Sequence, residues 1–509
     1  MAGKYVIALD QGTTSSRTVL INARGEIVDM AQRTFPQIYP HPGWVEHDPA
    51  DILNSQMVTL EEIIQRNNLS VREVAAIGIT NQRETTMIWD RATGKPVANA
   101  IVWQCRRTAP LVAEICNTED ICADVCARTG LHPDAYFSAS KIRWILDNTP
   151  GARERAEAGE LAFGTVDAWL IWNLTGATAS AGAVHATDRT NASRTMLYNI
   201  HEAAWDPTLL DLFGVPEGLL PKVLPSSALF GRVASGPLAG VPICGVAGDQ
   251  QAALFGQCCF ESGQAKNTYG TGCFLLMHTG TDAKTSTNNL VTTIAATAPE
   301  SAFIPSDKVE YALEVSVFIA GALVNWMVEE LQILETPAAS AAVAMSVEDS
   351  NGVYVVPAFT GLGAPYWDAE ARGAILGLTR GASRAHIVRA GLEALAYQVY
   401  DLVSAMQADA GCKLDVLNVD GGASANNFIL QFQADLLDTL VRRPQCTETT
   451  ALGAAYLAGL FAGFWQSTDE LKGLRASDTL FRCRITDAER DEKLAGWHEA
   501  VARVRTQGN

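Results

Sequence analysis

The sequence predicts an α/β protein of two related domains that flank a cleft, and three observations indicate this. The chain has 509 residues, which is more than one ordinary domain core accommodates. Short apolar runs alternate with amphipathic helical stretches along its whole length. A strand, a Gly-Thr turn and a second strand occur near the start and again at residues 266–277. We therefore expect a duplicated domain, with an N-terminal domain at 1–255 and a C-terminal domain at 256–509.

The individual elements follow from hydrophobic periodicity. Strands are predicted at 5–9, 17–21, 74–80, 86–89, 241–246, 266–269, 274–278, 353–357 and 414–419. Helices are predicted at 50–65, 138–147, 166–174, 250–255, 317–334, 383–407, 426–437, 451–461 and 487–504.

Composition excludes several classes of protein. The net charge of −18 disfavours a nucleic-acid binder, because a phosphate backbone would be repelled over most of the surface. The apolar stretch at 5–9 is too short for the core of a signal peptide, and no later run is long enough to span a membrane. We expect a cytoplasmic protein without a membrane span or a nucleic-acid partner.

The first Gly-Thr turn, residues 10–17, has the composition of a phosphate-binding turn. Gly12 allows close backbone approach to an anion, and Thr13, Thr14 and Ser15 can offer hydroxyl and amide donors. A fixed positive charge comes from Arg17. Asp10, at the carboxyl end of a predicted strand, is placed to hold Mg²⁺ directly or through water. The alternative for this segment alone is an ordinary β-hairpin turn.

Two further turns favour the phosphate interpretation. Residues 269–272 form a matching Gly-Thr turn that contains Thr271. Residues 419–427 join a strand to a helix, and the paired glycines there, Gly422 included, admit a flat ligand against the backbone. The phosphate loop GxxxxGK[ST] is absent from the sequence, so another nucleotide-binding class is indicated.

Together these turns resemble the superfamily of actin, hexokinase and the heat-shock chaperones, and within it the FGGY carbohydrate kinases. One family signature stands at residues 136–144, and a second runs from 373 to 393, with Gly391 where a larger residue is usual. Segments 43–49, 80–86, 102–107 and 245–257 are similar to the branch of the family that phosphorylates glycerol. The resemblance implies two ribonuclease-H-like (actin-like ATPase) domains, ATP and Mg²⁺ as cofactors, and assembly as a homodimer or homotetramer.

The resemblance also implies site residues. Asp249 would be the catalytic base, and Asp10 and Asp249 would hold the metal. Contacts to glycerol would come from Arg83, Glu84, Trp103, Tyr136, Asp249, Gln250 and Phe274. Contacts to the nucleotide would come from Thr13, Thr14, Ser15, Arg17, Thr271, Gly321, Asn325, Gly422 and Asn426.

Each of these residues also has a structural interpretation. Asp249 begins a predicted helix and could be an N-cap. An Arg83–Glu84 contact could be a surface ion pair, and Trp103 and Phe274 could be core aromatic residues. Val315 and Asn325 depart from the family pattern, where Gly and Gln are usual; Val315 could stiffen a strand-to-helix turn.

Two functional alternatives remain open at the level of sequence. One is a kinase for another sugar or polyol, such as a pentulose or gluconate. The other is a sensor that binds ATP without transferring its phosphate.

Overall fold

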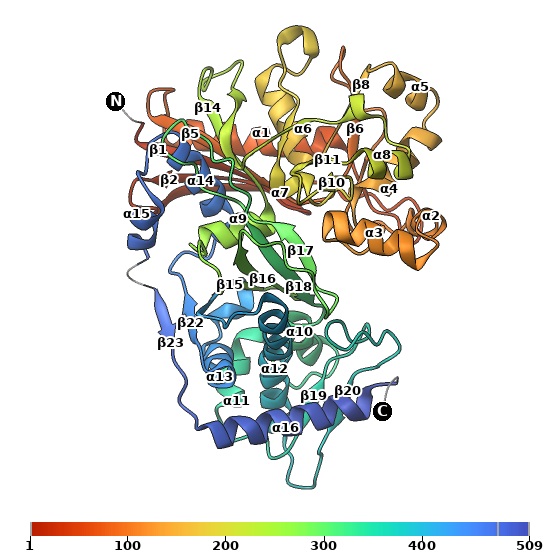
Figure 1. Ribbon diagram of the computed structural model, residues 1–509. Helices are drawn as coiled ribbons and strands as arrows, with labels where there is room; N and C mark the ends of the chain where they lie inside the picture. Colours follow the sequence, from red (N-terminus) through yellow and green to blue (C-terminus); the bar gives the residue numbers. More distant parts are fainter. Residues whose placement is uncertain (1–2, 476–477, 507–509) are drawn as a thin grey trace.

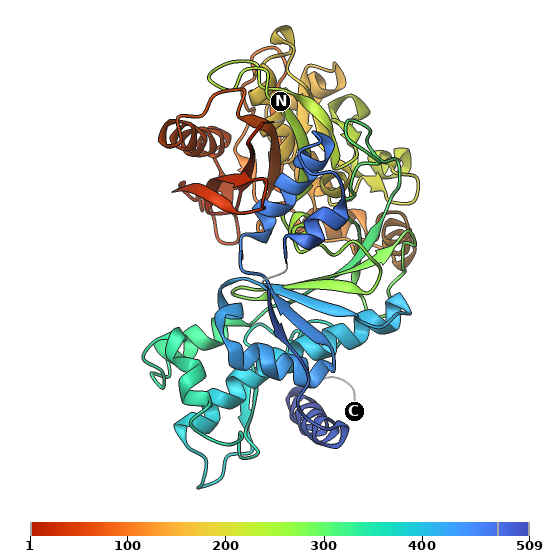
Figure 2. The same ribbon diagram turned by 90° about the vertical axis from the view of Figure 1, so that its left-hand side faces the viewer.

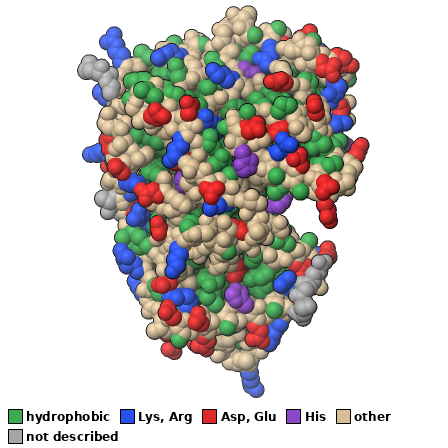
Figure 3. Space-filling view, in the orientation of Figure 1, with side chains coloured by type: hydrophobic (Ala, Val, Ile, Leu, Met, Phe, Trp, Pro, Cys, Tyr) green, Lys and Arg blue, Asp and Glu red, His purple; other side chains and the backbone are tan. Residues whose placement is uncertain are grey.

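The computed structural model describes residues 3–475 and 478–506, and it has two lobes, one above the other in Figure 1. Each lobe is built on one large sheet with helices on its faces. The space-filling view shows a notch in the outline at the boundary between the lobes (Figure 3).

The sheet of the first lobe has the order β13-β14-β5-β1-β2-β3. Its strands are β1 (Tyr5–Gln11), β2 (Ser15–Asn22), β3 (Ile27–Thr34), β5 (Val74–Asn81), β13 (Ser227–Arg232) and β14 (Pro242–Gly248). The first three form an antiparallel meander, whereas β1, β5 and β14 run parallel. Both faces are covered, because alternate residues of β1 enter two different cores. Ile7 packs with the helices α1 (Pro49–Arg66) and α6 (Val166–Thr175), and Val6 packs with α14 (Thr449–Phe461). The nearly continuous burial of β1 and β5 follows from this.

The sheet of the second lobe has the order β17-β18-β16-β15-β21-β22-β23. Its strands are β15 (Gln264–Tyr269), β16 (Cys273–Gly280), β17 (Val291–Ile294), β18 (Tyr311–Val317), β21 (Val416–Asp420), β22 (Leu440–Arg443) and β23 (Thr479–Phe481). Again a meander, β15-β16-β18, is antiparallel, and β15, β21 and β22 run parallel. The two sheets therefore share one plan, which confirms the predicted α/β fold of two related domains.

Smaller strands and the helices complete the lobes. The remaining strands are β4 (Glu46–His47), β6 (Met87–Asp90), β7 (Ala100–Ile101), β8 (Leu161–Gly164), β9 (Ala186–Asp188), β10 (Tyr198–Asn199), β11 (Ala204–Trp205), β12 (Lys222–Leu224), β19 (Tyr354–Val356) and β20 (Ala374–Leu376). The helices of the first lobe's sequence are α1 (Pro49–Arg66), α2 (Ala109–Ile115), α3 (Glu119–Thr129), α4 (Ser138–Asn148), α5 (Ala152–Glu157), α6 (Val166–Thr175), α7 (Arg189–Ala192), α8 (Pro207–Phe213) and α9 (Asp249–Gly256). Those that follow are α10 (Gly321–Glu329), α11 (Ser340–Ala344), α12 (Arg384–Ala410), α13 (Asn427–Leu437), α14 (Thr449–Phe461), α15 (Thr468–Gly473) and α16 (Asp487–Val504).

Helix α14 comes late in the chain but packs on β1, β5 and β14 of the first sheet. Figure 2 shows it in blue beside the red strands of the first lobe. It crosses α9 so closely that a Cβ at Gly453 would lie 1.8 Å from the carbonyl oxygen of Ala252. A Cβ at Gly256 would lie 2.0 Å from the carbonyl oxygen of Thr449, so this crossing requires glycine on both helices.

The division of the chain at 255/256 therefore describes its order and not every packing contact. The assignment of residues 1–255 and 256–509 to two functional domains stays a prediction. The ends of these two ranges, residues 1–2 and 507–509, lie outside the described residues.

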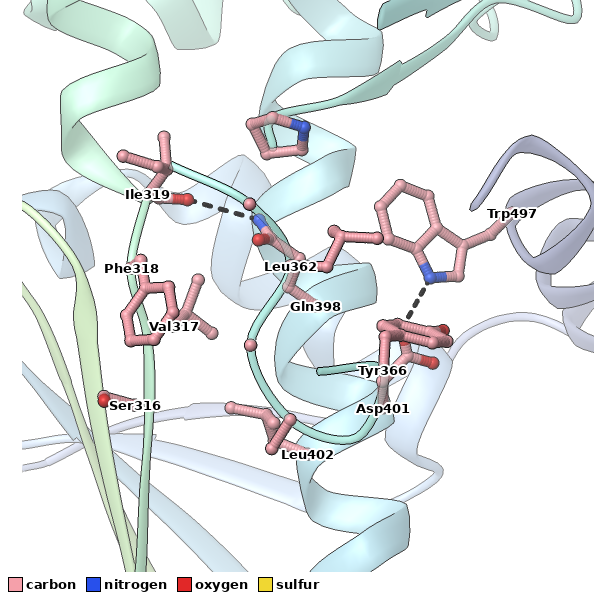
Figure 4. Close-up of a pocket in the computed structure, with 14 residues that line it drawn as sticks. Ser316, Val317, Phe318, Ile319, Leu362, Tyr366, Gln398, Asp401, Leu402 and Trp497 are labelled. Atoms are coloured by element: carbon pink, nitrogen blue, oxygen red, sulfur yellow. Dashed lines mark hydrogen bonds between the residues drawn. The ribbon is translucent and has the colours of Figure 1, made fainter. Parts of the chain in front are cut away.

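Helix α16 is fixed to α12 by a buried carboxylate (Figure 4). Asp401 of α12 accepts a hydrogen bond from Trp497 Nε1 at 2.7 Å, which Figure 4 shows as a dashed line. It also accepts from His498 Nε2 at 3.0 Å and from the Tyr366 hydroxyl at 2.9 Å. The ring of Trp497 also stacks on Tyr397, with centroids 5.1 Å apart. These contacts pack the C-terminal helix α16 against the hydrophobic core of the second lobe.

One predicted helix is wrong at its start. The segment 317–334 was predicted as one helix, but Val317 ends β18 and the helix α10 runs from Gly321 to Glu329. The apolar residues before Gly321 belong to a buried strand, and a short apolar run does not distinguish the two. Within the described residues, no helix has the length and apolar character that a membrane crossing requires.

Candidate active site

Asp249 is the first residue of α9, directly after the parallel strand β14. Gly248 holds the N-cap position, and no side chain caps this helix. The Asp249 carboxylate instead lies 3.2 Å from Arg83 Nε and accepts the backbone N–H of Gln250 at 2.8 Å. Its side chain is 34% exposed, so a ligand can reach it. Asp249 is therefore not the N-cap residue of α9, although its carboxylate accepts one backbone N–H of the first turn.

Arg83 and Glu84 follow β5 and are buried, which rules out a surface ion pair. The Arg83 guanidinium donates two hydrogen bonds to Glu314, at 2.6 and 2.9 Å, and a third to Gln251 Oε1 at 3.1 Å. Glu84 has a left-handed backbone, with φ of 59°, and such strain in a non-glycine residue is typical of functional sites. Burial raises the pKa of the Glu84 carboxyl above its usual range.

Aromatic side chains lie beside this pair. Trp103 and Tyr136 meet edge to face, with ring centroids 5.5 Å apart, and Trp103 Nε1 donates to Thr13 Oγ1 at 3.0 Å. Trp103 thus connects the predicted polyol residues to the first Gly-Thr turn. Phe274, on β16, is half-buried and is paired across the sheet with Thr268 and Ser316.

Lys266 is a charged residue in this region that the sequence reasoning placed only in a strand. It is fully buried, and its Nζ donates to Gln250 Oε1 and, at 3.0 Å, to Thr268 Oγ1. Burial lowers the pKa of this amine. The contact joins β15 of the second sheet to the N-terminal end of α9.

Asp10 and Arg17 stand opposite each other on β1 and β2. Their charged atoms are 3.6 Å apart, and Arg17 Nη1 also donates to Glu448 at 2.8 Å. Burial raises the pKa of Asp10 to about 6; Arg17 opposes this rise, and the carboxylates of Glu448 and Asp249 add to it. The cost of burying the Asp10 charge is therefore only partly offset by the nearby guanidinium of Arg17.

The turn between β1 and β2 is closed by the backbone N–H of Gly12, which donates to the carbonyl of Ser15 at 2.9 Å. Outside contacts also fix it: Phe35 N–H donates to the carbonyl of Thr14, and Gln32 donates to the hydroxyl of Ser15 at 3.0 Å. The turn is therefore held in shape without a ligand.

The other predicted nucleotide residues line one cavity of about 630 Å³ in the second lobe. They are Thr271, Gly321, Asn325, Gly422 and Asn426. Every residue that lines the cavity is uncharged. Asn426 caps α13 by accepting the N–H of Phe428 at 3.0 Å. Sequence reasoning missed one wall of the cavity, formed by Pro337, Ala338, Ser340, Ala341 and Met345, because nothing in that segment has a motif.

Gly321 lies where the cavity approaches the second Gly-Thr turn. A Cβ there would lie 2.6 Å from the carbonyl oxygen of Gly270, so glycine is needed for this contact. The backbone just before it is held by Gln398 of α12, which donates to the carbonyl of Ile319 at 3.3 Å (Figure 4). Val315 was expected to stiffen a turn here, but it lies inside β18 opposite Leu275, and it is 9% exposed.

The predicted site residues thus fall into two groups. Most of the polyol residues, with Asp249 and the first turn that includes Asp10, belong to the first lobe, whereas Phe274 lies on β16 of the second sheet. Five nucleotide residues form the separate cavity of the second lobe, whereas Thr13, Thr14, Ser15 and Arg17 are not among its lining residues.

Comparison with known proteins gives the family. The FGGY family of carbohydrate kinases matches with its N-terminal domain at residues 5–256 and its C-terminal domain at 265–462. A glycerol kinase of Clostridium botulinum is 57% identical over 505 residues, which cover 99% of each chain.

Two solved structures are also similar. Plasmodium falciparum glycerol kinase with ADP is 37% identical and superposes with a TM-score of 0.93, over 100% of this chain and 99% of the other. A ligand-bound xylulose kinase of Lactobacillus acidophilus has a TM-score of 0.84 at 21% identity, over 98% of each chain, and shows the fold alone. This chain belongs to the FGGY family of carbohydrate kinases.

Proposed function

We propose that this protein transfers the γ-phosphoryl group of ATP to glycerol and releases sn-glycerol 3-phosphate, a step of glycerol catabolism. The observation that carries the proposal is the carboxylate of Asp249, held by the buried Arg83 beside the half-buried aromatic pair of Trp103 and Tyr136. The full-length identity of 57% with a glycerol kinase supports glycerol over the sugars of more distant relatives.

Glycerol is bound by the polar groups of the cluster. Arg83, Glu84, Tyr136 and Gln250 supply donors and acceptors for its hydroxyls, and Trp103 and Phe274 enclose its carbon chain. A small polyol needs this combination, because only paired polar groups orient its hydroxyls and only apolar walls exclude water. Burial raises the pKa of the Tyr136 hydroxyl, so this group stays a hydrogen-bond donor at neutral pH.

ATP spans the two lobes. Its adenosine part occupies the uncharged cavity of about 630 Å³, against Thr271, Gly321, Asn325, Gly422 and Asn426. Its phosphates extend to Thr13, Thr14, Ser15 and Arg17 on the first turn. The binding of ADP by the related Plasmodium falciparum enzyme supports an adenine nucleotide here.

Magnesium fits the carboxylates at the phosphate end. Mg²⁺ prefers oxygen ligands. Burial raises the pKa of Asp10, and the carboxylates of Glu448 and Asp249 add to the rise, so the charged form of Asp10 would gain from a cation. Asp10 and Asp249 would hold the ion directly or through water. Bound there, Mg²⁺ would neutralise charge on the phosphates.

In the transfer itself, Asp249 accepts the proton of the attacking hydroxyl. Arg83 Nε, at 3.2 Å, orients the carboxylate of Asp249 for this role. The division into a polyol and phosphate domain at 1–255 and a nucleotide domain at 256–509 belongs to the same proposal. Assembly as a homodimer or homotetramer and a cytoplasmic location stay predictions.

An assay of ADP release tests the function. We expect rapid, Mg²⁺-dependent ADP release with glycerol, and far less with xylulose, gluconate and other polyols. Rapid turnover of xylulose with none of glycerol would establish the sugar-kinase alternative. ATP binding without transfer to any acceptor would establish the sensor alternative.

A further inference from the structure

Four buried charged residues form a closed ring at the polyol end of the site. Arg83 donates to both oxygens of Glu314, at 2.6 and 2.9 Å, and Arg194 Nη2 donates to Glu314 Oε1 at 3.2 Å. Arg194 Nε donates to Glu84 Oε1 at 2.6 Å, and Arg83 Nε lies 3.7 Å from the same oxygen. All four side chains are at most 8% exposed.

The ring joins the two lobes. Arg83 and Glu84 follow β5 of the first sheet, and Arg194 follows α7, which packs on β14 of the same sheet. Glu314, in contrast, is in β18 of the second sheet. The position of Arg83 therefore depends on a carboxylate from the opposite lobe.

Burial makes this dependence strong. A charge removed from water is stable only when it is paired and hydrogen-bonded, and removing one partner leaves the other uncompensated. Burial opposes ionisation of Glu314, but Arg194 and Arg83 outweigh it and lower the pKa of its carboxyl to about 2. Glu314 is thus ionised at any working pH.

Arg194 has one further donor. Its Nη1 is buried and has no hydrogen-bond partner among the described residues. The guanidinium carbon of Arg194 lies 5.5 Å from the ring centre of Tyr136, which belongs to the proposed polyol site. Buried N–H groups in native proteins almost always have a hydrogen-bond acceptor, so the lack of one at Arg194 Nη1 indicates an acceptor from a ligand.

We propose that Glu314 and Arg194 complete the polyol site: Glu314 positions Arg83 from the opposite lobe, and Arg194 positions Glu84 and donates its remaining N–H to a substrate oxygen. This inference rests on the proposed function and adds two residues to it. The polyol supplies the missing acceptor of the ring, so its binding and the correct placement of the second lobe favour each other.

The test uses the full-length variants Glu314→Gln and Arg194→Lys. Both keep approximate size, but the first removes the charge that holds Arg83 and the second removes the forked contact with Glu84 and Glu314. We expect the KM for glycerol to rise about 10- to 100-fold in each, as for loss of a hydrogen bond to a charged group. The KM for ATP should change less than about threefold, since the nucleotide cavity is uncharged. The double variant should be less impaired than the product of the two single effects, because the residues act as one unit.

A matched control is Glu310→Gln. Glu310 lies just before β18 and pairs with His278 at 3.3 Å and with Lys308, so this variant also loses one carboxylate charge but not the ring. Its KM for glycerol should equal that of the unaltered protein.

A second measurement separates positioning from a structural role. Glycerol should raise the melting temperature of the unaltered protein and of the control, but much less that of the two ring variants, whereas ATP should stabilise all of them equally. An unaltered glycerol KM and glycerol-induced shift in both ring variants would overturn the inference while the kinase reaction stands. If Glu314→Gln does not fold, Arg194→Lys decides by the same readouts. Absence of glycerol turnover in the unaltered protein would instead overturn the proposed function.

Discussion

The hairpin β1–β2 of the first lobe and the hairpin β15–β16 of the second occupy equivalent places in their sheets but differ in chemistry. In the first, Asp10 stands opposite Arg17 across the strand pair. In the second, Thr268 stands opposite Phe274. The same backbone plan thus presents a pair of opposite charges in the first lobe and an uncharged pair, a threonine and a phenylalanine, in the second.

The surroundings of the two hairpins differ in the same way. Asp10 shares its environment with Asp249, Arg17 and Glu448. The second turn, with Gly270 and Thr271, opens into a cavity lined entirely by uncharged residues. A duplicated scaffold can therefore separate two tasks: it carries charge where we propose that phosphoryl transfer takes place, and a neutral surface where we propose that the nucleoside binds. Three substitutions test this separation.

The largest effect is expected on the charged side, for Asp249→Asn. The amide cannot accept a proton, so kcat should fall about 10²- to 10⁴-fold, the usual contribution of a general base. Stabilisation of the protein by ATP in thermal unfolding should persist, because the cavity is unchanged. Steady-state kinetics and melting curves measure the two.

Asp206→Asn is the control for this prediction. Asp206 is also next to a helix start, but it caps α8 by accepting the N–H of Thr208 at 2.9 Å. It should lower stability and leave kcat unchanged. Near-normal turnover by Asp249→Asn would remove that residue from the chemistry.

A smaller effect is expected for Asp10→Asn, which should increase the stability of the ligand-free protein but reduce its activity. In the unfolded chain Asp10 ionises near its ordinary pKa of 3.8, whereas in the folded protein its pKa is about 6. The folded protein is therefore destabilised relative to the unfolded chain as pH rises from about 4 to about 6, because Asp10 ionises first in the unfolded chain. Above about pH 6 the full cost of burying the Asp10 charge remains. Asparagine should raise the melting temperature of the ligand-free protein by about 2–4 °C at pH 7.5 and not at all below about pH 4.

The same substitution should reduce activity, because it removes a carboxylate proposed to hold Mg²⁺. Titration of activity with Mg²⁺ should show a higher requirement than in the unaltered protein. If the variant is less stable than the unaltered protein at pH 7.5, the conclusion that the buried Asp10 charge destabilises the fold is wrong.

The smallest effect is expected on the neutral side, for Gly321→Ala. The added methyl group would lie 2.6 Å from the Gly270 carbonyl oxygen and would displace the second turn. Overpacking of about 1 kcal/mol corresponds to a roughly fivefold higher KM for ATP. The KM for glycerol should not change.

Gly473→Ala, where an added Cβ meets nothing within 4 Å, is the control. A changed glycerol KM with an unaltered ATP KM would contradict the placement of the nucleotide.

Periodicity found the central strands and most long helices but missed six strands of the two large sheets: β3, β13, β17, β18, β22 and β23. β3 is an edge strand whose residues after Ala31 are exposed, and β22 is a four-residue strand that contains two arginines. Neither has the continuous apolar run that marks a buried strand. β18 is apolar, but its end merged with the following helix in the pattern, which misplaced the start of α10 by four residues.

The sequence by itself determined the duplicated plan, the two Gly-Thr turns and most of the side chains gathered around the site, because these are local features with recognisable spacing. Only the tertiary structure decided which charges meet. Arg83 and Glu314 are 231 positions apart, and Arg194 and Glu84 are 110 apart. The pairing of residues so far apart has no period along the chain. It follows from how the elements pack in three dimensions, and burial then makes each charge depend on its distant partner.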